Sequence, residues 1–140
     1  MRYLCLYKPD GPEGIPPTEQ EMAAMGQLIE EMSSAGVLLS TEGCQPSTKG
    51  ARVRLRKGKI TVIDGPLTET KELVAGFAII QVNSREEAVE WTERFLRVAG
   101  DGESEIRQLH ALEDFGPEVT DEIRQQEERS RAQMQQNTSR

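Results

Sequence analysis

The chain has 140 residues, of which 36% are apolar, and its 24 acidic and 17 basic residues give a net charge of −7. This length fits one domain with a core of its own, and an acidic chain is repelled by phosphate, which disfavours binding to DNA or RNA. The N-terminal residues 1–8 have too few consecutive apolar side chains for a signal-peptide core, and the longest apolar run, 73–80, is too short to span a membrane. We therefore expect a cytoplasmic protein that binds neither nucleic acid nor membrane.

The first 36 residues predict a strand followed by a helix. Residues 3–7 are apolar on both faces of an extended segment, which suits a central strand covered on two sides. Thr18 and Glu21 form a capping box, and Gly36 can supply the left-handed residue that ends a helix. The apolar positions between them recur at helical spacing and predict one buried stripe: Met22, Met25, Ile29 and Met32.

The middle of the chain predicts a short strand and then a hairpin. Residues 37–40 form the short strand. Residues 52–56 alternate arginine with apolar side chains, which predicts one basic face and one buried face. A turn at 57–59 leads into the returning strand, 60–63. The two cysteines, Cys5 and Cys44, are expected to be small buried side chains rather than a disulfide or a nucleophile.

The last third predicts strand, helix and strand, followed by a polar tail. Residues 76–82 are apolar on both faces except at Gln81, which indicates a second inner strand. Ser84 and Glu87 form another capping box, and Ala88, Trp91, Phe95 and Val98 follow at helical spacing. Residues 105–110 alternate as the last strand. The segment 117–140 is mostly polar and is expected to be a solvated helix or disordered.

The order of these elements predicts an α+β fold. With the hairpin set aside it is β-α-β-β-α-β, the ferredoxin-like order, in which two helices cover one face of a four-stranded antiparallel sheet. Both inner strands are apolar on their second face as well, so a second copy of the chain is expected to cover it. The sequence therefore predicts a homodimer packed sheet to sheet, with a pocket between the two sheets.

Residues 64–77, which read DGPLTETKELVAGF, resemble the signature of the YCII-related proteins of the DGPF type. Matching features in the same order are Met1–Leu4, Ala35–Leu38, Glu42–Pro46, Arg52–Arg54, Glu86–Trp91 and Glu105–Arg107. The resemblance covers residues 1–116, leaving 117–140 as a tail, and implies a dimeric α+β barrel. Leu67 stands where the family has phenylalanine, so an aromatic ring is lost there. The His and Asp pair proposed as catalytic in shorter YciI-like relatives has no counterpart in this chain.

Asp64 is the first candidate for chemistry, because a carboxylate at a strand end beside an interface pocket could act as a base if burial raised its pKa. The alternative is structural, since an Asp before Gly-Pro also stabilises a turn. Four further residues are candidate ligand-binding groups: Arg54, Glu69, Lys71 and His110. Arg54 could bind a carboxylate, whereas the charged run around Glu69 and Lys71 also suits a solvated loop. His110, the single histidine, is interpreted as structural.

Two functions remain open from the sequence. The first is a non-catalytic homodimer that binds a small polar ligand or serves as an accessory or regulatory module. The second is a cofactor-free enzyme, of the lyase, isomerase or dehydrochlorinase type, that uses Asp64 on a small organic acid. The sequence has neither metal-ligand spacing nor a glycine-rich phosphate loop, so no cofactor is expected. The resemblance also suggests genomic association with an extracytoplasmic-function sigma factor.

Overall fold

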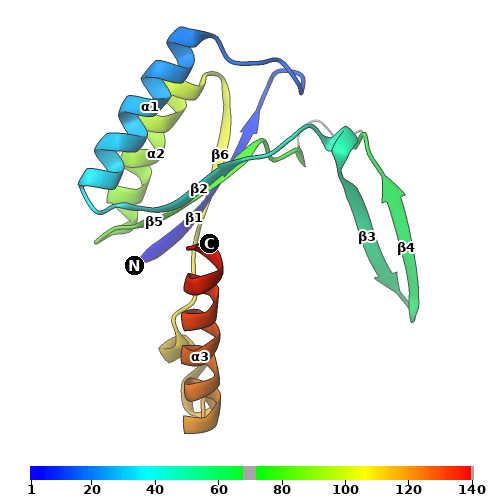
Figure 1. The fold of residues 1–140 in the computed structure, drawn as a ribbon, viewed down its shortest axis with the longest axis vertical. Helices are drawn as coiled ribbons and strands as arrows, with labels where there is room; N and C mark the ends of the chain where they lie inside the picture. Colours follow the sequence, from blue (N-terminus) through cyan, green and yellow to red (C-terminus); the bar gives the residue numbers. More distant parts are fainter. Residues whose placement is uncertain (68–71, 140) are drawn as a thin grey trace. The chain divides into compact units, whose positions relative to one another are not determined.

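A computed structural model describes residues 1–67 and 72–139 (Figure 1). Its elements in chain order are β1 (Arg2–Pro9), α1 (Glu19–Ser34), β2 (Leu38–Gly43), η1 (Ser47–Lys49), β3 (Ala51–Arg56), β4 (Lys59–Asp64), β5 (Gly76–Gln81), α2 (Arg85–Ala99), β6 (Gly102–Gln108), η3 (Leu112–Glu118) and α3 (Asp121–Thr138). The contacts divide the chain into two compact units, Met1–Leu109 and His110–Arg140, and each is described by itself.

The N-terminal unit contains a four-stranded antiparallel sheet. Its strand order is β2-β5-β1-β6, and β1 pairs with both β5 and β6. With the β3–β4 hairpin set aside, this is the ferredoxin-like arrangement. The predicted fold class is therefore confirmed, and the two strands with two apolar faces, β1 and β5, are the inner ones.

Helices α1 and α2 lie on the same face of this sheet (Figure 1). The core between them and the sheet is formed by Leu28 and Met32 of α1, Ala88 of α2, and strand residues that include Tyr3 and Ile80. Trp91, Phe95 and Val98 pack against this cluster, as their helical spacing predicts. The four-residue stripe expected on α1 is wrong at Met22, which is exposed because it lies one turn before the first helix residue that packs on the core.

Both predicted helix starts are formed by side-chain caps. Thr18 Oγ1 accepts a hydrogen bond from the Glu21 amide at 3.1 Å, and Ser84 Oγ accepts one from the Glu87 amide at 3.1 Å. The Glu87 carboxylate accepts from the amide of Asn83 at 2.9 Å, one residue earlier than a capping box requires. Each cap satisfies an amide that the helix itself leaves without a carbonyl partner, which fixes where α1 and α2 begin.

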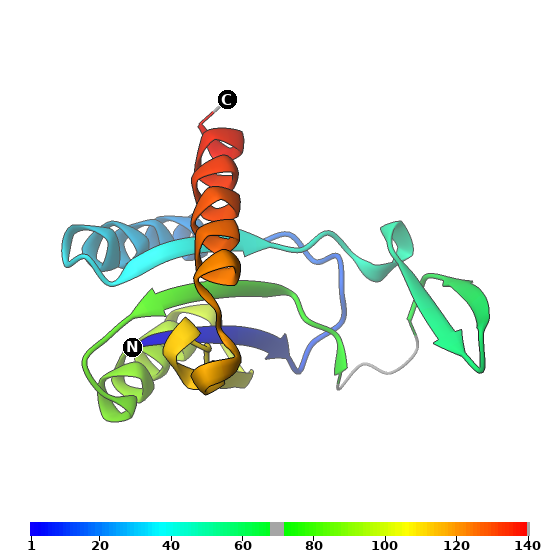
Figure 2. The same cartoon turned by 90° about the horizontal axis from the view of Figure 1, so that it is seen from below.

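The β3–β4 hairpin forms a separate two-stranded sheet that projects from the four-stranded sheet (Figures 1 and 2). The two predicted strands and the turn between them are confirmed. The prediction that one hairpin face is buried is wrong. Four apolar side chains on that face are exposed: Val53 by 66%, Leu55 by 62%, Ile60 by 58% and Val62 by 61%. Alternation places them on one face correctly, but nothing in the N-terminal unit covers them among the residues that the structure describes.

The C-terminal unit, residues 110–140, consists of η3 followed by α3. The α3 helix begins at a Thr120 cap, whose Oγ1 accepts from the Ile123 amide at 3.2 Å, and none of its described residues is buried. Most of the tail that follows residue 117 is therefore helical. Within residues 1–67 and 72–139, no helix has the length and apolar character needed to cross a membrane.

Candidate functional site

The Asp64-Gly65-Pro66 turn closes the base of the hairpin by a close backbone contact with residues 47 and 50, which precede β3. The Gly65 amide donates to the Gly50 carbonyl at 3.0 Å, and the Gly65–Pro66 peptide is cis. A Cβ atom on Gly65 would lie 1.7 Å from the carbonyl oxygen of Ser47. Glycine is therefore required at the centre of this turn because no side chain fits against the Ser47 backbone.

Ser47 and Glu13 hold the other side of the same turn. Ser47 Oγ donates to Glu13 Oε2 at 2.6 Å and accepts from the Leu67 amide at 3.0 Å, while the Ser47 amide donates to Glu13 Oε1 at 2.9 Å. Ser47 is 9% exposed, and its hydroxyl is engaged on both its donor and its acceptor sides. These bonds give the hydroxyl a structural role. Sequence reasoning missed both residues, since Glu13 and Ser47 lie 34 positions apart in loops without a motif.

Asp64 and Arg54 lie on opposite faces of the hairpin. Asp64 pairs in register with Ala51, and Arg54 pairs with Thr61. Because side chains alternate along a strand, residues 51 and 54 point to opposite sides. Asp64 thus shares the exposed apolar face with Val53 and Val62, while Arg54 belongs to the basic face. Both side chains are exposed, so one hairpin does not bring them together.

The remaining predicted site residues lie elsewhere. His110 belongs to the C-terminal unit, where its Nδ1 is 3.6 Å from Asp114 Oδ2 and its ring centroid is 4.8 Å from that of Phe115. Asp114 also accepts a hydrogen bond from the Ala111 amide at 2.8 Å, so its carboxylate organises the start of η3. Glu69 and Lys71 lie outside the described residues.

The cysteines differ from each other. Cys5 points toward the helices, and burial raises the pKa of its thiol above the ordinary value although Thr92 acts in the opposite direction. A thiol with a raised pKa has little thiolate at neutral pH and is a poor nucleophile. Cys44 is exposed, contrary to the prediction that both cysteines are buried, because it follows the end of the edge strand β2, where its backbone amide donates to the Ala75 carbonyl at 2.7 Å.

The sheet face opposite the helices carries an apolar centre. Tyr3, Cys5 and Ile80 contribute to the core on the helix side, so the alternate positions of β1 and β5 point the other way. These alternate positions pair across the two inner strands, Leu4 with Ile79 and Leu6 with Phe77. We call these four residues the open-face floor. All four are partly exposed.

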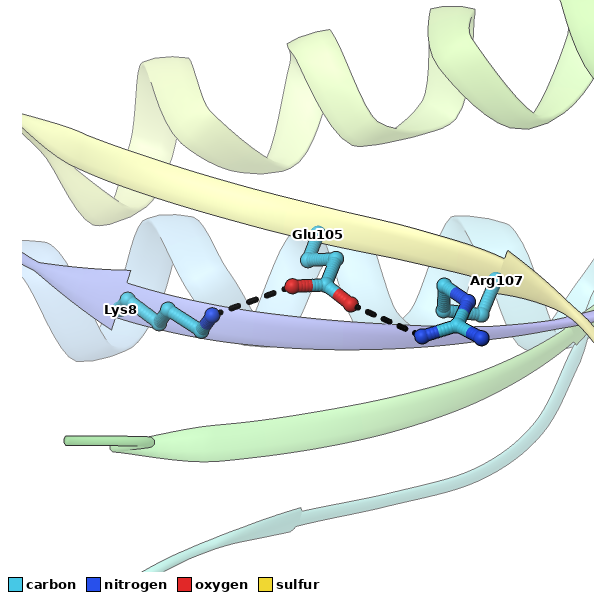
Figure 3. A network of polar contacts seen from close by, with 3 residues as sticks. All are labelled: Lys8, Glu105 and Arg107. Carbon is cyan, nitrogen blue, oxygen red and sulfur yellow. Dashed lines mark hydrogen bonds and ion pairs between the residues drawn. The ribbon is translucent and has the colours of Figure 1, made fainter. Parts of the chain in front are cut away.

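A polar network lies beside this floor at the β6 edge (Figure 3). Lys8 Nζ is 3.1 Å from Glu105 Oε1, and Arg107 NH1 is 3.4 Å from Glu105 Oε2. In register, Glu105 is opposite Leu6 and Arg107 is opposite Leu4, so both side chains share the face of the floor. The Lys8 side chain is 19% exposed and that of Arg107 is 71% exposed. Hydrogen bonds from Lys8 and then Arg107 hold the pKa of the Glu105 carboxyl below its ordinary value.

The open face therefore combines an apolar surface with two cations held around one carboxylate. On its other side, Ser40 is opposite Ile79 and Glu42 is opposite Phe77, so β2 supplies a second polar edge. Such a surface suits a small molecule with an apolar body and an anionic group. Among residues 1–67 and 72–139, no three His, Cys, Asp or Glu side chains are grouped to hold a metal ion.

We expect Gly65→Ala to destabilise the protein by about 2–4 kcal/mol, because the new Cβ would overlap the Ser47 carbonyl and the backbone must shift. Urea unfolding followed by circular dichroism measures the change. Gly11→Ala is the matched control: its added Cβ would have no atom within 4 Å, so its effect should stay within about 0.5 kcal/mol. Equal effects of the two substitutions would contradict the close contact.

Glu105 should contribute to stability in a pH-dependent manner. Its pKa is lowered in the folded chain, so its contribution is fully present above the unfolded value of about 4.3 and is lost as pH falls through the lower folded pKa. The stability difference between wild type and Glu105→Gln should be constant from about pH 7 to pH 5 and shrink below about pH 4. Glu118→Gln in the C-terminal unit controls for the loss of one negative charge. A difference that grows on acidification would contradict this assignment.

Three comparisons with known proteins place the chain beside other sequences and structures. The model of the YCII-related domain matches residues 1–112. An uncharacterised protein of Rhizobium meliloti (strain 1021) is 33% identical over 73 residues, which are 52% of this chain and 59% of that protein, so the match spans about three fifths of the relative. The solved structure of a 5-chloro-2-hydroxyhydroquinone dehydrochlorinase from Burkholderia phenoliruptrix AC1100, in complex with 2,5-dihydroxybenzoquinone, aligns with a TM-score of 0.45 and 16% identity over 79% of this chain and 94% of that one. Because the family model covers most of the sequence, the chain belongs to the YCII-related family.

Proposed function

We propose that the chain is a homodimeric binding module that holds a small organic acid between the open faces of two four-stranded sheets. The observation that carries the proposal is the open-face floor, bordered by the Lys8–Glu105–Arg107 network. The module would act through binding, as an accessory or regulatory component, and not through chemistry.

The floor supports the dimer. Leu4, Leu6, Phe77 and Ile79 occupy the centre of a sheet, and the two helices pack only on its other side. Contiguous apolar surface of this kind is favourable to bury against another protein, and a self-complementary patch buries twice its own area in a two-fold dimer. Sheet-to-sheet packing removes both floors from bulk water and encloses the space between them in which a ligand lies.

The charged border supports the class of ligand. A guanidinium has five N–H donors, and Arg107 uses one of them toward Glu105 at 3.4 Å. Its remaining donors can bind a carboxylate in a bidentate manner, while the apolar body of the ligand lies on the floor. Glu105 reduces the negative charge that a bound ligand can carry, because its carboxylate already neutralises the positive charge of Lys8 at 3.1 Å. A monoanion with an apolar or aromatic body therefore fits better than a polyphosphate.

A second function, cofactor-free acid–base catalysis by Asp64, is favoured by one observation. Asp64 lies on the apolar face of the hairpin, so a subunit packed there would enclose its carboxyl group together with any substrate bound in that contact. The reaction would then occur in a contact made by two chains. The two proposed functions differ in one requirement: the enzyme needs the Asp64 carboxylate for its activity, whereas the binding module does not need it to bind its ligand.

The wider setting is also part of the proposal. A cytoplasmic location and an association with an extracytoplasmic-function sigma factor are predictions from the sequence and its resemblance. Both fit an accessory role for a module that senses a small acid.

The dimer should depend on the open-face floor. Leu6→Asp places a charge at the centre of that face and should convert the dimer to monomer, because an unpaired carboxylate is costly to bury. Size-exclusion chromatography with light scattering measures the mass, and circular dichroism checks the fold. Met22→Asp, on an exposed α1 position, should leave the dimer intact. A wild-type protein that is monomeric at high concentration would contradict the proposal.

Ligand binding should require both an anion and Arg107. Benzoate and its neutral analogue benzamide serve as paired probes in calorimetric titrations. We expect benzoate to bind, benzamide to bind more weakly, and Arg107→Gln to weaken benzoate binding at least tenfold, because a charge-assisted hydrogen bond is lost. Arg129→Gln on the surface of α3 is the control. Asp64→Asn should leave benzoate binding unchanged, whereas equal binding of benzoate and benzamide would contradict the anion site.

A further inference from the structure

We infer that the β3–β4 hairpin is an intersubunit arm whose apolar face packs on a second copy of this chain. The inference rests on the proposed homodimer and goes further, because it assigns a second contact surface outside the four-stranded sheet. The arm face is defined by two directly opposed pairs, Val53 with Val62 and Leu55 with Ile60.

Exposure of the arm face to water is unfavourable in free energy. Its four side chains are each between 58% and 66% exposed, and the directly opposed pairs place them next to one another. A two-stranded hairpin is marginally stable by itself, and it needs a third element against its apolar face for independent stability. The hairpin's own fold thus favours a partner on that face.

The arm is anchored firmly at its base. The Gly65 amide bonds to the Gly50 carbonyl across the two ends of the hairpin, and the Leu67 amide bonds to Ser47 Oγ. The contact between Gly65 and the Ser47 backbone adds a steric constraint at the same point. These contacts hold the two ends of the hairpin together, which reduces the conformational entropy lost at its base when the arm binds.

Charge complementarity indicates a second copy as the occupant. Residues 51–64 contain five basic residues and one acidic residue, whereas the rest of the chain contains 12 basic and 23 acidic residues. The basic side chains Arg52, Arg54 and Lys59 lie on the reverse of the arm face, as their register shows. The hairpin as a whole is attracted by the acidic body of another copy, and this long-range attraction brings the two chains together. Because the cations lie on the reverse face, they stay in water when the apolar face is buried.

The test uses a pair of isosteric substitutions on the arm. Val53→Thr with Val62→Thr replaces two opposed methyl groups by hydroxyls and keeps the β-branched shape that a strand favours. Analytical ultracentrifugation should show the dimer dissociation constant raised about tenfold or more, because two buried apolar groups become polar. Raising the salt from 0.05 M to 0.5 M should also weaken the wild-type dimer, since salt screens the attraction between arm and body.

Ile63→Thr is the matched control, because Ile63 lies on the basic face opposite Arg52 and is also exposed. It should leave the dissociation constant unchanged. If the wild-type dimer forms but the Val53→Thr and Val62→Thr protein dimerises equally well, the arm inference fails and the proposed sheet-to-sheet dimer stands. If the wild type shows no dimer at any concentration, the proposed function fails together with the arm.

A basic two-stranded ribbon is also of a size that enters the DNA major groove, so the experiment includes that competitor. A fluorescently labelled mixed-sequence duplex is titrated with the protein at about 0.15 M salt. No binding is expected, because the chain as a whole is acidic. Duplex binding that is lost in Arg54→Gln, with dimerisation unaffected, would assign the arm to nucleic acid and overturn the inference.

Discussion

The structure depends on one constraint: the inner strands of the sheet are apolar on both faces, while the two helices of the N-terminal unit, α1 and α2, pack on one face. Tyr3 and Ile80 enter the core under α1 and α2, and the alternate residues Leu4 and Ile79 point to the other side. The ferredoxin-like order places both helices of the N-terminal unit on the first face and neither of them on the second. The location of the candidate site follows, because the polar side chains of β6 meet the apolar floor only there.

The DGP turn, the most distinctive motif of the sequence, has its clearest role in packing. Gly65 approaches the Ser47 backbone so closely that a Cβ cannot be accommodated, and Ser47 links Glu13 to the amide of Leu67. These contacts fix the base of the hairpin. The glycine of this signature is thus explained by the geometry of a junction, without a catalytic role.

Sequence patterns predicted those features that depend on neighbours along the chain. The caps at Thr18 and Ser84, the strand pairing of the hairpin and the two-faced inner strands follow from local spacing. The Lys8–Glu105 pair joins residues 97 positions apart, and it exists because β1 and β6 become neighbours in the sheet. The exposure of Val53 and Val62 could not be predicted either, since alternation tells which residues share a face and not what covers it.

The same distinction applies to Asp64. Its position at the end of β4 is evident from the sequence, but its surroundings depend on whether another chain lies against the arm face that it shares with Val62. An exposed carboxylate has no substrate held against it, whereas the same group enclosed by a partner chain could act as a base on a molecule bound there. The choice between module and enzyme is therefore a question of assembly. The residues that decide it are the apolar side chains of the arm face. They determine whether a partner subunit packs there and excludes water from Asp64.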